Sequence, residues 1–193
     1  MYTEQLNEAG FVVDGGRALV IVVWSGSYER FSPLEGYASA RVDQQMESAL
    51  AWRRDVGIAL DYLDTRADLD ASHAGFLGIS IGAVGQGILL AVEPRLNAAV
   101  LISGGVDRIN ELHPLADLAN FAPRITIPVL MVNGRMDHIL PYATSQKALF
   151  DLLGSEASAK AHVVYEGGHF AYQRNLVIRN VSDWFDRYLG AVR

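Results

Sequence analysis

The sequence predicts an α/β fold in which a mainly parallel β-sheet is covered by helices on both faces. Short apolar runs rich in β-branched residues alternate along the chain with longer segments whose apolar residues recur every three or four positions. Such alternation is typical of parallel sheets, because each return to a parallel strand needs a crossover, usually a helix. The 193 residues are enough for one domain with a sizeable core, and we expect residues 1–193 to form one.

About five strands are predicted, at residues 18–24, 74–79, 98–102, 129–132 and 161–165. The first of them reads ALVIVVW and is apolar at every position. A continuous apolar run of this length is typical of a parallel strand buried on both faces. We therefore expect residues 18–24 to form a strand that is buried on both faces.

Four helices are predicted, at residues 42–63, 81 to about 91, 141 to about 153, and 176–189. The first has one apolar stripe at helical spacing. Pro94 follows the second helix as a stop signal, and Pro141 suits the first turn of the third. The segment at 106–127 contains two prolines and no clear period, so we expect a loop with at most short helices.

Composition excludes several classes of function. The net charge of −6 and the pI near 5.3 argue against nucleic-acid partners, which need clustered Lys and Arg. The absence of Cys excludes disulfides and thiolate chemistry. No apolar run approaches the ~20 residues of a membrane span, and the first residues lack the features of a signal peptide. We therefore expect a cytoplasmic protein without membrane partners. We also expect no cofactor, since the glycine-rich stretch at 82–87 lies inside a predicted helix and does not resemble a phosphate-binding loop.

Three residues with reactive side chains follow predicted strands. Ser80 lies between a strand and a helix, Asp137 comes a short turn after the strand at 129–132, and His169 follows the last strand. Ligands of parallel sheets bind beyond the carboxyl ends of the strands. We therefore expect these three side chains to meet at one edge of the sheet.

The residue types at these positions suit nucleophilic catalysis. A serine hydroxyl is a weak nucleophile at neutral pH, so His169 would accept its proton, and Asp137 would orient and stabilise the imidazole. In the sequence GISIG at 78–82, glycines on both sides of Ser80 would permit a tight turn that exposes the hydroxyl. The N–H of Ile81, at the start of the helix, would donate to a developing oxyanion.

Simpler interpretations exist for each residue. Ser80 would also serve as a helix N-cap, and Asp137 would also suit a turn. The rival carboxylates and histidines are Asp107, Asp117, His73, His113, His138 and His162. His73 precedes its predicted strand and His162 lies inside one, which favours His169 as the base. The histidines lack the spacing of metal ligands, so no metal site is predicted.

The sequence resembles the α/β-hydrolases, and among them the dienelactone-hydrolase and prolyl-oligopeptidase-like esterases. The resemblance extends over about residues 10–189 and is carried by GSYER at 26–30, LDYLDTR at 60–66, GISIG at 78–82, PVLMVNGRMD at 128–137 and GGH at 167–169. It implies that Ser80 is the nucleophile, Asp137 the acid and His169 the base, in the chain order that this fold uses. It also implies hydrolysis of esters, and in some members of amides.

The resemblance further implies strands that this sequence lacks. The family has more strands before the one matched by residues 18–24, and a glycine-rich loop after one of them supplies a second oxyanion donor. We expect the backbone at Ser25 and Gly26 to replace that donor. The alternatives are a segment of a second chain, or weak or absent catalysis.

A missing strand also has consequences for assembly. It would lie between the strands at 18–24 and 74–79, whose backbone groups cannot remain unpaired. We expect these two strands to pair directly, and the alternative is that another chain inserts material between them. Direct pairing would leave a five-stranded sheet with apolar edges and thin helix cover on one face, which favours self-association, so we predict a homo-oligomer.

The expected function is that of a small serine esterase acting on short acyl esters. The short segment at 106–127 leaves little material for a large lid. Trp24, Tyr28, His138 and Tyr142 are predicted to line the substrate site, although simple packing explains each equally well. The alternatives are a peptidase or amidase with the same triad, and a catalytically weak hydrolase scaffold with an interaction role.

Overall fold

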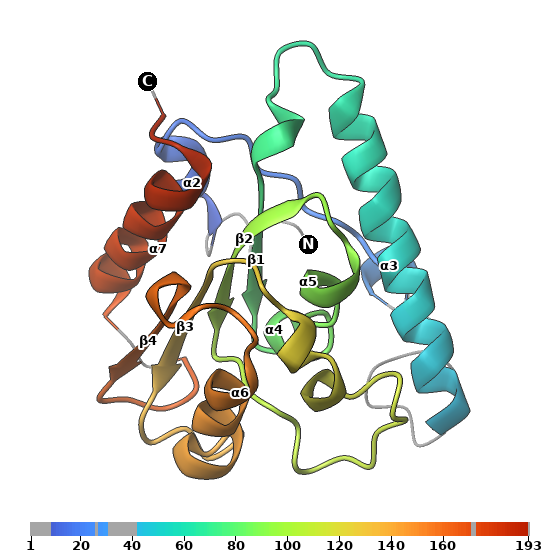
Figure 1. The fold of residues 1–193 in the computed structure, drawn as a ribbon, viewed down its shortest axis with the longest axis vertical. Helices are drawn as coiled ribbons and strands as arrows, with labels where there is room; N and C mark the ends of the chain where they lie inside the picture. The colour runs from blue at the N-terminus through green and yellow to red at the C-terminus, as the bar shows by residue number, and fades with distance from the viewer. Residues whose placement is uncertain (1–8, 26, 31–41, 171–172, 193) are drawn as a thin grey trace.

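The computed structural model describes residues 9–25, 27–30, 42–170 and 173–192. In these residues four parallel strands form one sheet in the order β1-β2-β3-β4. They are β1 (Ala74–Ile79), β2 (Leu96–Ile102), β3 (Val129–Gly134) and β4 (Lys160–Tyr165). Because every strand pairs in parallel with the next one in the sequence, all four carboxyl ends lie at one edge of the sheet (Figure 1).

Helices cover both faces of the sheet, as predicted. Alternate residues of β2 point to opposite faces: Leu101 packs in one core cluster with Leu89, whereas Val100 packs in another with Val181 and Trp184. The first face is covered by α3 (Val42–Asp64), α5 (Leu89–Val92) and α6 (Lys147–Leu152), and the second by α7 (Arg174–Leu189) and the short α2 (Phe11–Asp14). Figure 1 shows α3 and α7 on opposite sides of the strands.

The predicted helices at 42–63 and 176–189 are confirmed, and the other two are corrected. The helix expected over 81–91 is divided into α4 (Ile81–Val84) and α5, with Gly85 and Gly87 between them. Glycine is a poor helix former, and a Cβ at Gly87 would lie 2.7 Å from the Ala83 carbonyl oxygen. The helix expected over 141–153 consists of a π-helical turn, Tyr142–Gln146, followed by α6. The loop at 106–127 contains only the short turns Leu118–Asn120 and Ala122–Arg124, as predicted.

The predicted first strand does not form. Residues 18–24 are irregular, and none of them is buried. The segment is instead fixed to α3, because the Ser25 N–H donates to Asp55 Oδ2 at 2.8 Å and Trp52 Nε1 donates to the Ser25 carbonyl at 2.9 Å. Direct pairing with β1 is therefore wrong for this chain, and the described sheet has four strands rather than five. An apolar sequence favours a strand only where a neighbour offers free backbone groups in register.

The helices of the described ranges include none that is both long enough and apolar enough to cross a membrane. The longest helix, α3, carries charged residues along its exposed side, including Arg53, Arg54 and Asp61.

Candidate active site

Ser80 occupies a sharp turn between β1 and α4. Its φ of 52° lies in the left-handed region, which costs a residue with a Cβ about 1–2 kcal/mol. The turn is held by the Ser80 N–H, which donates to the Ile102 carbonyl at 2.9 Å. It is also held by close packing, because a Cβ at Gly78 would lie 2.9 Å from the Gly82 backbone. The similar restriction predicted at Gly82 is wrong, because a Cβ there would meet no atom within 4 Å outside the helix's own backbone.

The Ser80 hydroxyl does not cap the helix that follows it. It lies 2.8 Å from His169 Nε2, and His169 Nδ1 lies 2.7 Å from Asp137 Oδ2. His169 and Asp137 are only 7% and 3% exposed. With the ring proton on Nδ1, His169 donates to the carboxylate, and its Nε2 accepts the serine hydroxyl proton. The three residues thus form a continuous chain of hydrogen bonds, shielded from water at its acidic end.

The loop that carries Asp137 is fixed by backbone and side-chain hydrogen bonds. The second carboxylate oxygen, Oδ1, accepts from the N–H groups of Ile139 and Leu140 at 2.9 and 3.0 Å. Gln146, which is fully buried, donates through Nε2 to the carbonyls of Gly134 and Leu140, both at 2.8 Å. Asp137 is thereby prevented from rotating away from His169.

The loop that carries His169 is held against the ends of β2 and β3. The Ser103 hydroxyl donates to the His169 carbonyl oxygen, and Ser103 itself has a φ of 50°. Gly134 lies so close to this loop that a Cβ would stand 2.1 Å from the Gly168 carbonyl oxygen. The structural roles of Ser103, Gly134 and Gln146 were not predicted from the sequence. The stretch SGG at 103–105, directly after a strand, was the one local signal of a special turn.

The Ile81 N–H, expected from the sequence as an oxyanion donor, begins α4 directly after Ser80. The N–H groups of Ala83 and Val84 donate to the Ser80 carbonyl, whereas the Ile81 N–H makes no hydrogen bond in the described part of the chain. The Ser25 N–H is engaged by Asp55, so it does not replace the second donor, contrary to expectation. Gly26 lies outside the described residues.

The rival acids and bases have structural hydrogen bonds. Asp107 accepts from the backbone of Ile109, and Asp117 caps a short turn by accepting from Ala119. His162, inside β4, lies 3.0 Å from Asn133 Oδ1, and its burial lowers its pKa to about 4. His162 therefore remains neutral at neutral pH and is a packed residue, as the sequence analysis expected.

The residues predicted to line the substrate site have separate surroundings in the structure. Trp24 packs on Trp52, with ring centroids 6.5 Å apart, in a small cluster that includes Val84 and Leu140. Tyr142 stacks on His162 at 5.9 Å. His138 is exposed beside Asp137, and the side chain of Tyr28 lies outside the described part.

Four exposed apolar side chains, called the apolar rim below, are adjacent or close to the site residues in the sequence. They are Ile81, Met136, Ile139 and Phe170, and their exposed fractions run from 43% to 65%. The Phe170 ring meets the His169 ring edge-on, with centroids 4.4 Å apart. Such a rim suits the apolar part of a ligand.

Comparison with known proteins found no matching family model and no matching curated protein. Solved structures do match. A cold-adapted esterase from an Arctic intertidal metagenomic library is 26% identical, with a TM-score of 0.63 over 76% of this chain and 63% of that one. TT1662 from Thermus thermophilus is 22% identical, with a TM-score of 0.63 over 84% of this chain and 75% of that one. Acetyl xylan esterase 1 from Thermoanaerobacterium sp. is 18% identical, with a TM-score of 0.62 over 94% of this chain and 69% of that one.

The fold is that of the α/β-hydrolases. This confirms the fold class and the resemblance found in the sequence. The chain spans less than two thirds of the length of the cold-adapted esterase, so the described sheet corresponds to part of that enzyme's structure.

Proposed function

We propose that this chain is a serine hydrolase that cleaves small carboxylic esters. The observation that carries the proposal is the chain of hydrogen bonds from Ser80 Oγ through His169 to Asp137, at 2.8 and 2.7 Å. A nucleophile, a base in contact with it and an orienting carboxylate are the arrangement that acyl transfer requires.

The geometry supports a two-step reaction. Ser80 Oγ attacks the ester carbonyl carbon while its proton passes to His169 Nε2, and the oxyanion forms beside the Ile81 N–H. The tetrahedral intermediate then expels the alcohol, which takes the proton from His169. Water, deprotonated by His169, attacks the acyl-enzyme in the second step and releases the acid and the Ser80 hydroxyl. Asp137 keeps the imidazole in the required tautomer and stabilises its charged form throughout.

Two further observations favour small esters as the substrate class. The exposed apolar side chains of Ile81 and Phe170 offer contact to an acyl or alcohol group beside the nucleophile. The cold-adapted esterase, 26% identical to this chain, is named for ester hydrolysis. The same triad would serve a peptidase or amidase, but no observation favours either.

One observation favours a second candidate, a weakly active scaffold with an interaction role. Of the two backbone N–H groups expected at the oxyanion, those of Ile81 and Ser25, the second is engaged by Asp55. Loss of one oxyanion donor lowers kcat by about 10²–10³. A strand from a second chain that occupied the edge of β1 could supply the missing donor.

The test combines a nucleophile probe with a substrate series. A fluorophosphonate should label Ser80 in the wild type, and p-nitrophenyl esters of two to eight acyl carbons should be hydrolysed fastest at the short end. Ser80→Ala should abolish both, lowering kcat by about 10⁶, with unchanged circular dichroism. Labelling without turnover of any ester would support the scaffold. Full activity of Ser80→Ala would exclude Ser80 from the mechanism.

A further inference from the structure

Two non-glycine residues in the described ranges, Ser80 and Ser103, have a left-handed backbone, with φ angles of 52° and 50°. This conformation crowds the Cβ against the backbone, a cost that glycine alone avoids. Residues that keep such a conformation cluster at functional sites. Ser80 is the proposed nucleophile. The same strain at Ser103, which is fully buried directly after β2, indicates that its side chain also has a function.

Glycine is the residue that the backbone at position 103 favours. The next two residues, Gly104 and Gly105, are glycines that the packing requires, because Cβ atoms there would lie 3.0 Å from Ala83 Cβ and 2.3 Å from Ser145 Oγ. A third glycine at position 103 would relieve the strain. Because glycine lacks only the side chain, the hydroxyl of Ser103 is the group whose function offsets the strain.

That hydroxyl donates to the backbone carbonyl oxygen of His169. Within the described ranges, this is the only hydrogen bond to the backbone of His169. The nearest other one joins the Met136 N–H to the Gly167 carbonyl at 2.8 Å. Since Gly167 and Gly168 have no side chains to restrict them, the loss of the Ser103 hydroxyl would leave the backbone of the base free to shift.

The turn at Ser103 is itself fixed by its neighbours. The Ser103 N–H donates to the Val132 carbonyl at 2.8 Å. The Gly104 carbonyl accepts from Asn133 Nδ2 at 2.8 Å, and Asn133 Oδ1 lies 3.0 Å from His162 Nε2. Because Asn133 donates to Gly104 through its amide nitrogen, its oxygen faces His162, and His162 Nε2 carries the proton. Hydrogen bonds therefore connect β4 through β3 to the turn that holds His169.

We propose that Ser103 is a positioning residue for the catalytic base. Its hydroxyl fixes the backbone of His169, so that Nε2 stays 2.8 Å from Ser80 Oγ while Nδ1 stays 2.7 Å from Asp137 Oδ2. A displacement of about 1 Å from the productive geometry lowers a rate by as much as 10²-fold. This proposal rests on the proposed serine-hydrolase function.

The test makes the same substitution at two buried serines. Ser103→Gly removes the hydroxyl and relieves the strain, so kcat for p-nitrophenyl acetate should fall about 10- to 100-fold while Tm changes by less than about 3 °C. KM should stay within twofold, because a fully buried Ser103 does not contact substrate. Wild-type kcat in Ser103→Gly would overturn the proposal.

Ser155→Gly is the matched control. The Ser155 hydroxyl donates to the carbonyls of Ile125 and Ile127, before the amino end of β3 and away from the site. Ser155 has no left-handed backbone to relieve, so its replacement should lower Tm by about 3–6 °C and leave kcat within twofold. An equal loss of kcat at the two serines would contradict a specific role for Ser103.

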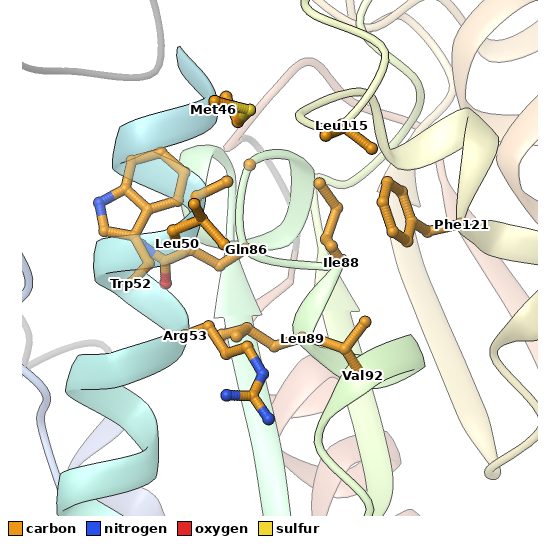
Figure 2. A pocket seen from close by; sticks show the side chains of 12 residues that line it. Met46, Leu50, Trp52, Arg53, Gln86, Ile88, Leu89, Val92, Leu115 and Phe121 are labelled. Carbon is orange, nitrogen blue, oxygen red and sulfur yellow. The ribbon is translucent and has the colours of Figure 1, made fainter. Parts of the chain in front are cut away.

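Two more variants separate positioning from flexibility and from stability. Ser103→Ala removes the hydroxyl without the added freedom of glycine, and kcat should fall as in Ser103→Gly. Wild-type kcat in Ser103→Ala would contradict the proposal. Ile88 lines an apolar pocket between α3 and α5, apart from the three site residues (Figure 2). Ile88→Val should lower Tm by about 2–4 °C without lowering kcat. Losses of kcat that follow Tm across all variants would show a structural role only.

A second measurement does not depend on turnover. The Nδ1 proton that His169 shares with Asp137 should give a strongly downfield proton NMR resonance in the wild type. Ser103→Gly should shift or broaden this resonance, and Ser155→Gly should not. An unchanged resonance in Ser103→Gly would overturn the proposal. A wild type that neither hydrolyses esters nor reacts with a fluorophosphonate would refute the proposed function, and the resonance would still decide whether Ser103 positions His169.

Discussion

The carboxyl ends of the strands and the segment at residues 18–24 differ in how well the structure matches the prediction made for each. At the carboxyl ends, hydrogen bonds join Ser80, Asp137 and His169, although Ser80 and His169 are 89 positions apart in the sequence. In contrast, the most strand-like sequence of the chain, at residues 18–24, pairs with no strand in the described residues. The difference teaches that a site forms where several elements supply partners, and that an apolar run without a partner stays irregular.

The largest effect on activity is expected from removing the carboxylate that orients His169. Asp137→Asn should lower kcat for ester hydrolysis by about 10⁴, because the amide favours the wrong histidine tautomer. The matched controls Asp107→Asn and Asp117→Asn change carboxylates that cap turns elsewhere, and their rates should stay within a few-fold of the wild type. A comparable loss in either control would move the role of the acid away from Asp137.

A second prediction concerns the tight contact between β3 and the loop that carries His169. Gly134→Ala places a Cβ 2.1 Å from the Gly168 carbonyl oxygen, so the loop must move, at a cost of about 3 kcal/mol in the free energy of unfolding. Gly168→Ala is the matched control, because a Cβ there meets no atom within 4 Å, and it should change stability by less than about 0.5 kcal/mol. Urea denaturation measures both, and equal effects would contradict the contact.

A third prediction uses the pKa of His162, which burial lowers to about 4. In the unfolded chain this histidine has its ordinary pKa near 6.5, so the unfolded state takes up the proton first as pH falls. The contribution of His162 to stability is therefore complete above pH 6.5 and is lost between about pH 6.5 and 4. His162→Gln, which can still donate to Asn133, should lose less stability over this window in urea titrations. Parallel curves for the two proteins would show that His162 does not contribute.

The smallest expected effect concerns residues 18–24, where we propose that a second copy of the chain associates. Val20 is 42% exposed in the unpaired segment, and sheet edges with apolar neighbours favour self-association. The wild type should sediment as a dimer or larger species. Val20→Lys should shift it toward the monomer while changing the free energy of unfolding by less than about 0.5 kcal/mol. A wild type that is monomeric at every concentration would contradict the proposal.

The site could be predicted from the sequence because its signals are local. Ser80, Asp137 and His169 each follow a strand within a few residues, and parallel strands bring their carboxyl ends to one edge. Gln146 and Ser103 could not be predicted, because their roles depend on carbonyls of other loops that the chain brings near only after folding. The strand expected at 18–24 was wrong for a related reason, since a ladder depends on a distant partner that the sequence of one segment does not reveal.

The left-handed backbone of Ser80 has a consequence for how this sequence can change over generations. Glycine would occupy the same turn without the steric cost, so Ser80→Gly exchanges the hydroxyl for stability. A lineage that ceased to use the hydroxyl would lose the benefit of the hydrogen bond to His169, and the steric cost of the turn would then favour glycine. The strained serine is therefore a position where selection for chemistry and selection for foldability act in opposite directions.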